Sequence, residues 1–229
     1  MNRVILSAST DETILAVTRQ HKLVDLEIEQ QINTEIVGCI YKGVVKNIVP
    51  AVDGIFVDIG IGKNAFLRRK DLLNEKRFPT EGSPILAQVI KSDTDMKGAL
   101  ITEKISMFGK YAVTLSGTGY IGVSKKIRQE SVRKRLKEIG KEICAEHMGL
   151  IIRTAAENAD MDEFRKDITR LKENWDIIQK RFRMEKSPTL LYRESDIIVK
   201  ALRDYVNKGT EILITDNRKI YERICKLNE

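Results

Sequence analysis

The sequence GIFVDIG at residues 54–60 decides the fold expected for the first half of the chain. Side chains alternate between the two faces of a strand, so Ile55 points to one face and Phe56 to the other. The stretch KNAFL at residues 63–67 places Phe66 on an outer face in the same way. Two outward phenylalanines among lysines and arginines are typical of a surface that stacks nucleic-acid bases. The alternative is an interface with a neighbouring domain, because aromatic side chains usually pack.

A small closed barrel accounts for the short strands around this stretch. Five strand candidates follow one another, at residues 36–49, 54–59, 65–67, 85–91 and 99–102. Five short strands in about seventy residues match the size of a barrel of the oligonucleotide-binding type, which limits exposed edges by closing on itself. We therefore expect residues 35–105 to form such a barrel.

The two ends of the chain are predicted to form one domain together. Residues 2–34 alternate strand patterns with polar breaks and resemble a three-stranded meander, whose apolar face needs a cover in water. Residues 193–229 have the pattern helix, strand, helix and offer the apolar helices that the meander lacks. We therefore expect a discontinuous domain of residues 1–34 plus 193–229, into which the middle of the chain is inserted.

The middle of the chain changes from strands to helices after residue 105. Residues 129–147 place apolar side chains at helical spacing, and lysines and arginines fill much of the rest, so one face is packed and the other is basic. A second helix follows, with Phe164 on its apolar stripe and Asp160 as its cap. Residues 106–192 thus form a separate region, and the whole chain is predicted to be an α+β multidomain protein.

The composition of the chain favours an anionic partner. The 229 residues carry a formal net charge of +7, and a basic balance without an apolar span points to nucleic acid more than to membrane. The apolar run at the start is too short for a signal peptide or a transmembrane helix, so we expect a cytoplasmic protein. Cys39, Cys144 and Cys225 are too far apart in sequence for a disulfide framework or a paired zinc site.

Two short segments offer groups that bind phosphate. The sequence GVSKK at residues 122–126 combines backbone donors, a hydroxyl and two cations. Arg153 and Thr154 combine a guanidinium fork with a hydroxyl. If folding brings the two segments together, they form a pocket for a terminal phosphate. The alternative for each is an exposed loop or strand end, which the residues alone favour.

Few residues indicate catalysis. Asp93 and Asp95 could hold a magnesium ion, although solvated acids in turns are the more frequent case. Asp216 and Asn217 follow a predicted strand, and Asn217 is better explained as a helix N-cap. The sequence has no glycine-rich phosphate cradle of the nucleotide-binding kind.

Six segments of the chain closely resemble the N-terminal half of bacterial endoribonucleases of the RNase E/G family. They are IYKGVV at residues 40–45, GIFVDIG at 54–60, AFL at 65–67, KGALIT at 97–102, GVS at 122–124 and GLIIRTA at 149–155. In that family an RNase H-like domain is split by an S1 RNA-binding barrel and a 5′-sensor region. The resemblance therefore implies the following domains: an incomplete RNase H-like domain at residues 1–34 plus 193–229, the S1 barrel at 35–105 and the 5′ sensor at 106–192.

The resemblance also implies roles for individual residues. The residues that it assigns to an S1 surface for single-stranded RNA are Phe56, Phe66 and Lys97. The residues that it assigns to recognition of a 5′-monophosphate are Arg153 and Thr154, with Gly122 and Val123 in the facing loop. The implied function is that of the substrate-binding half of an endoribonuclease acting in RNA processing and decay.

Catalysis in the family belongs to a following DNase I-like domain, whose aspartates hold magnesium, and a cysteine pair then forms a zinc link between subunits. The sequence ends at Glu229, before those elements, so we expect no metal site in this chain and a monomer or weak oligomer. We also expect RNA binding without efficient cleavage. Two alternatives stay open: a standalone S1-type RNA-binding regulator, and a nuclease that uses Asp58, Asp93, Asp95 or Asp216 with magnesium.

Overall fold

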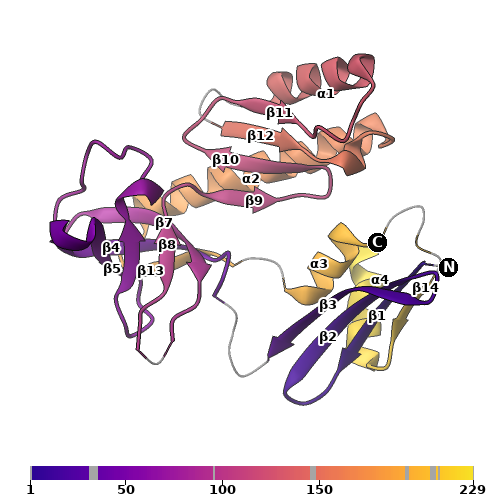
Figure 1. Ribbon diagram of the computed structural model, residues 1–229, viewed down its shortest axis with the longest axis horizontal. Helices are drawn as coiled ribbons and strands as arrows, with labels where there is room; N and C mark the ends of the chain where they lie inside the picture. The colour runs from indigo at the N-terminus through magenta and orange to yellow at the C-terminus, as the bar shows by residue number, and fades with distance from the viewer. Residues whose placement is uncertain are drawn as a thin grey trace. The chain divides into compact units, whose positions relative to one another are not determined.

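The chain divides into two compact units. The computed structural model describes residues 2–30, 36–94, 96–144, 148–193, 196–206, 210 and 212–228. One unit joins Met1–Glu35 with Ser195–Glu229 and is called the split unit below; the other, Ile36–Glu194, is called the central unit (Figure 1). The described residues form a mixed α/β structure with four α-helices and a closed five-stranded barrel. The domain identities that the resemblance assigns to these regions stay predictions.

The barrel occupies the first part of the central unit. Its strands are β4 (Ile40–Val49), β5 (Gly54–Asp58), β6 (Ala65–Arg68), β7 (Pro84–Lys91) and β8 (Leu100–Thr102). They pair in the order β4-β5-β6-β8-β7, and β7 returns to β4, so each strand has a partner on both sides. The β6–β8 pair is parallel and the other pairs are antiparallel. The predicted barrel of the oligonucleotide-binding type is confirmed.

The first barrel strand begins at Ile40 and not at residue 36 as predicted. Gly38 has a φ of 83°, and the Cys39 amide donates a hydrogen bond to the Ile36 carbonyl at 3.0 Å, which closes a turn. Glycine adopts a positive φ at little steric cost. The apolar residues before Ile40 therefore pack on the barrel from a turn instead of extending the strand.

The side chains of β5 and β6 alternate as the sequence predicts. Ile55, Val57 and Leu67 are fully buried in the barrel core, whereas Phe56 and Phe66 are half-buried on the other face. Burying one large apolar side chain contributes about 1.5–3 kcal/mol. The inward set therefore fixes the register, because a slip of one residue would turn that set to the outside.

A four-stranded sheet occupies the second part of the central unit. Its strands are β9 (Ser106–Phe108), β10 (Ala112–Ser116), β11 (Ile121–Val123) and β12 (Met148–Ile152). They lie in the order β11-β12-β10-β9. Strands β11 and β12 are parallel, and Val123 pairs with Ile152 at their carboxyl ends. The residues that follow these two strands therefore leave the sheet at the same edge.

Two helices, α1 (Glu130–Ile143) and α2 (Met161–Met184), cover this sheet (Figure 1). Leu136 of α1 and Phe164 of α2 are buried in one core with the strands. Asp160 caps α2 as predicted, since its carboxylate accepts hydrogen bonds from two amides of the first turn. Helix α1 ends at Ile143, after which the backbone turns to an extended conformation, and residues 145–147 of the predicted helix lie outside the described residues.

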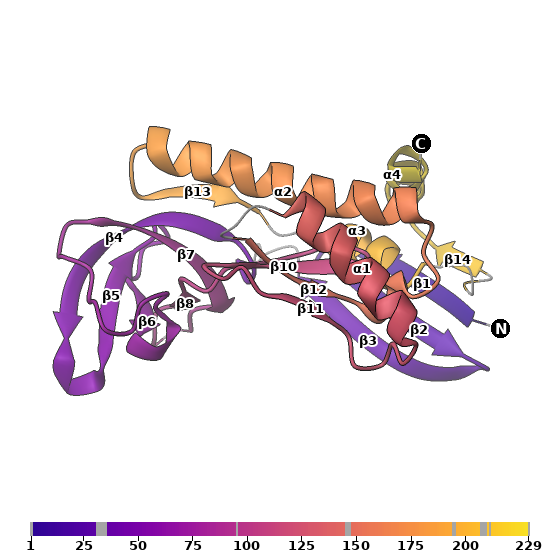
Figure 2. The same cartoon turned by 90° about the horizontal axis from the view of Figure 1, so that it is seen from above.

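Helix α2 connects the sheet to the barrel. The strand that follows it, β13 (Thr189–Tyr192), pairs antiparallel with the first half of β4 (Figure 2). Lys42 of β4 is buried, and its Nζ donates to the carbonyls of Phe182 and Glu185 at 2.7 Å each. A cation at the carboxyl end of a helix satisfies open carbonyls and complements the helix dipole. These contacts fasten the end of α2 to the barrel.

The split unit is a sheet covered by two helices. Its strands are β1 (Asn2–Ala8), β2 (Glu12–Arg19), β3 (Lys22–Gln30) and β14 (Ile212–Thr215), in the order β14-β1-β2-β3. The helices are α3 (Ile197–Asp204) and α4 (Arg218–Asn228), and they pack on the sheet through Ile198 and Ile220. They cover the face that carries Leu15 and Val17 of β2, whereas Val24, Leu26 and Ile28 of β3 remain 51–55% exposed, so the predicted cover is only partial. No helix in the described part of the chain is long and apolar enough to cross a membrane.

Candidate nucleic-acid interface

Phe56 and Phe66 form an aromatic pair on the outside of the barrel. They are partners across β5 and β6, and their ring centroids lie 5.4 Å apart at an interplanar angle of 52°. A Cβ atom at Gly54 would lie 2.3 Å from the Phe66 ring, so glycine there lets the ring lie against the β5 backbone. Both rings are partly exposed, which leaves a surface on which bases can stack.

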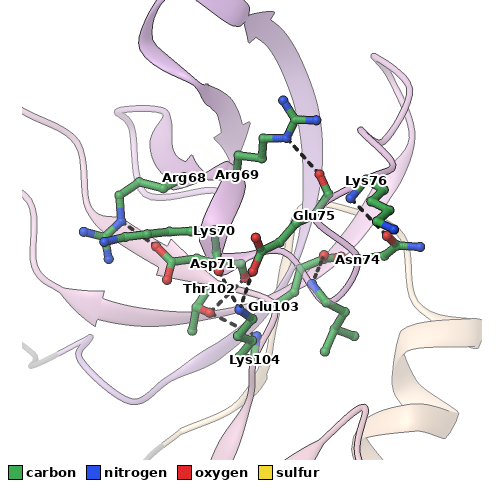
Figure 3. Close-up of polar contacts among 11 residues, drawn as sticks. Arg68, Arg69, Lys70, Asp71, Asn74, Glu75, Lys76, Thr102, Glu103 and Lys104 are labelled. Carbon is green, nitrogen blue, oxygen red and sulfur yellow. Dashed lines mark hydrogen bonds and ion pairs between the residues drawn. The ribbon is translucent and has the colours of Figure 1, made fainter.

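Arg68 places a positive charge beside this aromatic pair, and Asp71 holds its guanidinium. It is the cross-strand partner of Gly54 and follows Phe66 by two residues, so its side chain leaves the same face of the sheet. Its Nε donates to the Asp71 carboxylate at 2.5 Å, which orients the guanidinium (Figure 3). Arg68 is one of the arginines that the sequence places around the outward phenylalanines, and its two-residue spacing from Phe66 puts it on their face of the sheet.

Lys97 lies in the hairpin between β7 and β8. Its amide donates to the carbonyl and the hydroxyl of Thr94, and the Thr94 amide donates back to the Lys97 carbonyl. Leu100, three residues further on, is the β8 partner of Phe66. The structure therefore brings the exposed Lys97 to the end of the strand that borders β6, which carries the aromatic pair.

The two phosphate-type segments meet at the carboxyl ends of β11 and β12. The hydroxyl oxygens of Ser124 and Thr154 lie 3.0 Å apart, and the Ser124 amide donates to the Ile152 carbonyl at 2.8 Å. Gly122 and Val123 belong to β11 directly before Ser124. We call Gly122, Val123, Ser124, Arg153 and Thr154 the strand-end site. The structure therefore brings together the two phosphate-type segments, which the sequence alone could not place relative to each other.

Arg153 follows β12 directly, and the backbone of a neighbouring loop holds its guanidinium. Its Nη1 donates to the Gly109 carbonyl at 2.8 Å, and its own amide donates to the Tyr111 carbonyl at 2.8 Å. We call residues 109–111, which connect β9 and β10, the support loop. One edge of the guanidinium is held in this way, which orients its plane.

A buried carboxylate of α2 holds the support loop in turn. Asp167 accepts hydrogen bonds from the amides of Lys110 at 3.2 Å and Tyr111 at 2.8 Å. A Cβ atom at Gly109 would lie 2.5 Å from this carboxylate, so glycine permits the close approach. A buried carboxylate is tolerated because its oxygens are hydrogen-bonded. Asp167 therefore acts as a positioning residue for Arg153 through the support loop, a role that sequence reasoning missed.

Tyr111 adds a second link between the support loop and α2. Its hydroxyl donates to the Glu163 carboxylate at 2.5 Å, and its ring contacts Phe164 edge-on at 6.4 Å between centroids. Burial raises the pKa of Tyr111 well above its ordinary value, and the bond to the Glu163 carboxylate raises it further. The hydroxyl therefore stays protonated and keeps its role as a donor at neutral pH.

Arg133 of α1 holds the loop on the other side of the strand-end site. Its Nη1 donates to the carbonyls of Ser124 at 2.7 Å and Ile127 at 3.0 Å. Its Nε lies 3.7 Å from the Glu130 carboxylate. The start of α1 is thus tied to the loop that carries the Ser124 hydroxyl.

The acids considered for a metal site have other partners or lie in exposed positions. Asp58 forms an ion pair with a lysine of β4 at 3.4 Å, and Asp93 is exposed in the β7–β8 hairpin. Asp216 accepts hydrogen bonds from the Ser7 hydroxyl and the Ala8 amide, and the Ser7 bond lowers the pKa of Asp216. Asp95 lies outside the described residues. Within the part that is described, no three His, Cys, Asp or Glu side chains could hold a metal ion together.

Asn217 caps helix α4 as predicted. Its Oδ1 accepts hydrogen bonds from the amides of Lys219 at 3.0 Å and Ile220 at 3.2 Å. This is the arrangement of a helix N-cap, in which a short polar side chain satisfies amides of the first turn. The side chain is thus engaged in local structure.

A mostly apolar cavity of about 380 Å³ lies between the barrel and α2. Leu86, Ile105 and Trp175 are among the residues that line it, and Glu103 and Asp176 are its charged groups. Burial raises the pKa of Glu103. Among the described residues that line the cavity there is no lysine or arginine, so it does not suit RNA phosphate.

Comparison with protein families agrees with the geometry of the barrel and of the region after it. The S1 RNA binding domain matches residues 34–102, which contain the barrel. The Ribonuclease E/G family matches residues 106–229, more than half of the chain. The chain belongs to the ribonuclease E/G family. The strand-end site lies within the segment that the ribonuclease E/G family matches.

Known proteins of the ribonuclease E/G family extend this match over nearly the whole chain. Ribonuclease G of Escherichia coli strain K12 is 32% identical over 97% of this chain and 49% of that protein. Ribonuclease G of Haemophilus influenzae is 31% identical over 99% of this chain and 50% of that protein. Ribonuclease E of Buchnera aphidicola subsp. Schizaphis graminum is 31% identical over 97% of this chain and 25% of that protein. The chain therefore spans about half the length of the ribonuclease G relatives.

If the strand-end site recognises a 5′-monophosphate, Asp167→Asn should reduce the preference for 5′-monophosphorylated RNA over 5′-hydroxyl RNA. Asparagine keeps the shape of the side chain but loses one acceptor for the two support-loop amides, so Arg153 is held less firmly. We expect the ratio of the two dissociation constants to fall several-fold, by about 1 kcal/mol. Binding titrations with both RNAs measure this ratio.

Arg170→Ala is the matched control for this substitution. Arg170 is a mostly exposed partner of the Asp167 carboxylate at 2.9 Å and lies three residues after Asp167 on the same helix. Its removal should leave the ratio of dissociation constants unchanged. An unchanged ratio in a folded Asp167→Asn variant would show that Asp167 has only a structural role.

Proposed function

We propose that this chain binds single-stranded RNA through its S1 barrel and recognises a 5′-monophosphate at the strand-end site. In this role it is the substrate-binding half of a ribonuclease E/G-type endoribonuclease acting in RNA processing and decay. The contact between Ser124 and Thr154, with Arg153 beside it, carries the proposal. Hydroxyl and guanidinium donors are suited to the three acceptor oxygens of a terminal phosphate.

The two surfaces would recognise different features of the RNA. Phe56 and Phe66 offer stacking faces, which accept any base because every base has a π-face. Arg68 and Lys97 offer cations for the backbone beside them. The strand-end site would distinguish the chemistry of the 5′ end, because a hydroxyl end offers neither the charge nor the acceptors of a phosphate.

Cleavage is not part of the activity proposed for these 229 residues. A magnesium-activated water needs carboxylates placed at the scissile phosphate, and the candidate acids with described side chains serve other contacts or lie apart. The resemblance assigns the magnesium and zinc sites to the DNase I-like domain and the cysteine pair that follow the matched region in family members. We therefore derive no step through a metal in this chain.

A binding titration of one short single-stranded RNA in 5′-monophosphate and 5′-hydroxyl forms tests the proposal. Magnesium is present throughout, and the RNA is recovered and examined on a gel. We expect tighter binding of the phosphate form and intact RNA. Equal binding of the two forms would favour an S1-type RNA-binding regulator, and site-specific cleavage that follows the protein through purification would favour a nuclease.

A further inference from the structure

Helix α1 carries a row of lysines that the proposed site does not explain. Lys134, Lys137 and Lys141 recur at intervals of three and four residues, which places them on one side of the helix. All three side chains are exposed. We call them the lysine row. The rise of a helix makes the row about 10 Å long from its first to its last residue.

The opposite side of α1 is packed inside the protein. Leu136 and Ile139 are buried in the core that α1 shares with β11 and β12, and a Cβ atom at Gly140 would lie 3.2 Å from Leu150. A helix that lies in a membrane surface needs an exposed apolar face. Since the apolar face of α1 is already covered, the row suits a polyanion in water and not a lipid surface.

In the described part of the chain, no ion pair neutralises the charges of the lysine row. On α1, Glu130 pairs with Arg133 at 3.7 Å, and Glu142 pairs with Arg165 of α2 at 3.0 Å. Glu138 remains as the acid beside the row. None of the three lysines forms an ion pair with another residue of the described part of the chain.

Helix α2 shows the opposite behaviour. Four of its cations pair with carboxylates at 2.5–3.0 Å, and these are Arg165, Arg170, Lys172 and Arg181. Ion pairs of this kind support a helix, whereas a row of like charges weakens it. An excess of positive charge on α1 therefore has no stabilising role within the helix.

The lysine row begins beside the strand-end site. Arg133 lies one turn before Lys137 on the neighbouring side of α1, and it bonds to the carbonyls of Ser124 and Ile127. Lys125 and Lys126 are exposed in the loop between Ser124 and the helix. Exposed cations therefore follow Ser124 in the loop and continue along α1.

We propose that the lysine row binds backbone phosphates of the RNA whose 5′ end occupies the strand-end site. This inference rests on the proposed function and adds a second contact region to it. Ammonium groups are point charges that contact phosphate without reading bases. Binding by the row is therefore independent of RNA sequence and of the 5′ end, and it weakens as salt rises.

The triple variant Lys134→Gln, Lys137→Gln and Lys141→Gln tests the inference. Dissociation constants for a single-stranded RNA of about 16 nucleotides are measured over a range of salt concentrations. Each lost phosphate contact lowers the slope of log affinity against log salt by about 0.7, so the slope should fall by about 2. At about 0.1 M salt the affinity should fall at least about tenfold, equally for 5′-monophosphate and 5′-hydroxyl RNA.

A second triple variant of equal charge change is the matched control. Lys166, Lys180 and Lys186 are exposed on α2 or just after it, and their replacement by glutamine should leave the slope unchanged. If the slope falls equally in both triple variants, the loss of affinity follows the net charge of the protein and not the position of the lysines, and the inference is wrong.

Comparison with the aromatic pair separates failure of this inference from failure of the proposed function. If the lysine-row variant folds and keeps the normal slope while Phe56→Ala weakens binding, the row does not contact RNA and the proposed function stands. If the lysine-row, Phe56→Ala and Arg153→Ala variants all bind RNA normally, the proposed function is wrong as well. Thermal unfolding of each variant establishes that it is folded.

Discussion

Replacing Phe56 or Phe66 by alanine should weaken the binding of single-stranded RNA by about 1–3 kcal/mol for each base stack that is lost. Both rings lie on the outer face of the barrel, so their removal leaves the core side chains of β5 and β6 in place. The rings also contact each other at 5.4 Å, so the effects of the two substitutions should not be additive. Fluorescence anisotropy at one fixed salt concentration measures the loss.

An exposed aromatic residue of the split unit provides the control for this prediction. Tyr221 on α4 is 61% exposed, and Tyr221→Ala should not change the affinity for RNA. Normal affinity in folded Phe56→Ala and Phe66→Ala variants would instead show that the pair is a packing feature of the barrel surface. The use of 5′-hydroxyl RNA keeps the strand-end site from contributing to the comparison.

Arg153→Ala should abolish the preference for 5′-monophosphorylated RNA while leaving the affinity for 5′-hydroxyl RNA unchanged. A hydrogen bond to a charged group contributes about 1.5–3 kcal/mol, which corresponds to roughly tenfold or more in affinity. Lysine would keep the charge but lose the planar fork, so Arg153→Lys should restore only part of the preference. Paired titrations with the two RNAs give the ratio directly.

Arg165→Ala controls for the loss of one positive charge in the same unit. Arg165 pairs with Glu142 at 3.0 Å between α2 and α1, away from the residues of the strand-end site. Its removal should leave the preference for the phosphate form unchanged. An equal loss of affinity for both RNAs in Arg153→Ala would make Arg153 a general backbone contact and not a sensor of the 5′ end.

The barrel could be predicted from sequence because its signal is local. Alternating side chains between glycines fix both the strand and its inner face within about seven residues, as Ile55 and Phe56 illustrate. The start of the first strand could not be placed as well. The apolar residues before Ile40 continue the strand pattern, and only the positive φ of Gly38 turns them away.

The strand-end site was harder to predict because its parts are distant in sequence. Ser124 and Thr154 meet only because β11 and β12 pair in parallel around the intervening α1. The support of Arg153 is more remote still, since Asp167 reaches Lys110 from another element of the fold. No periodicity records such a contact, and a single acidic residue inside an amphipathic helix looks like any other charged position.

The pairing of β13 with β4 has a consequence for dissecting the chain into domains. β13 covers Ile40, Tyr41 and Lys42 of β4, on the half of the strand that β5 does not reach. A barrel excised at residue 105 would present this row of backbone donors and acceptors to solvent. Such a bare edge is a template for pairing with other chains and hence for aggregation. A barrel expressed for isolated study should therefore include β13.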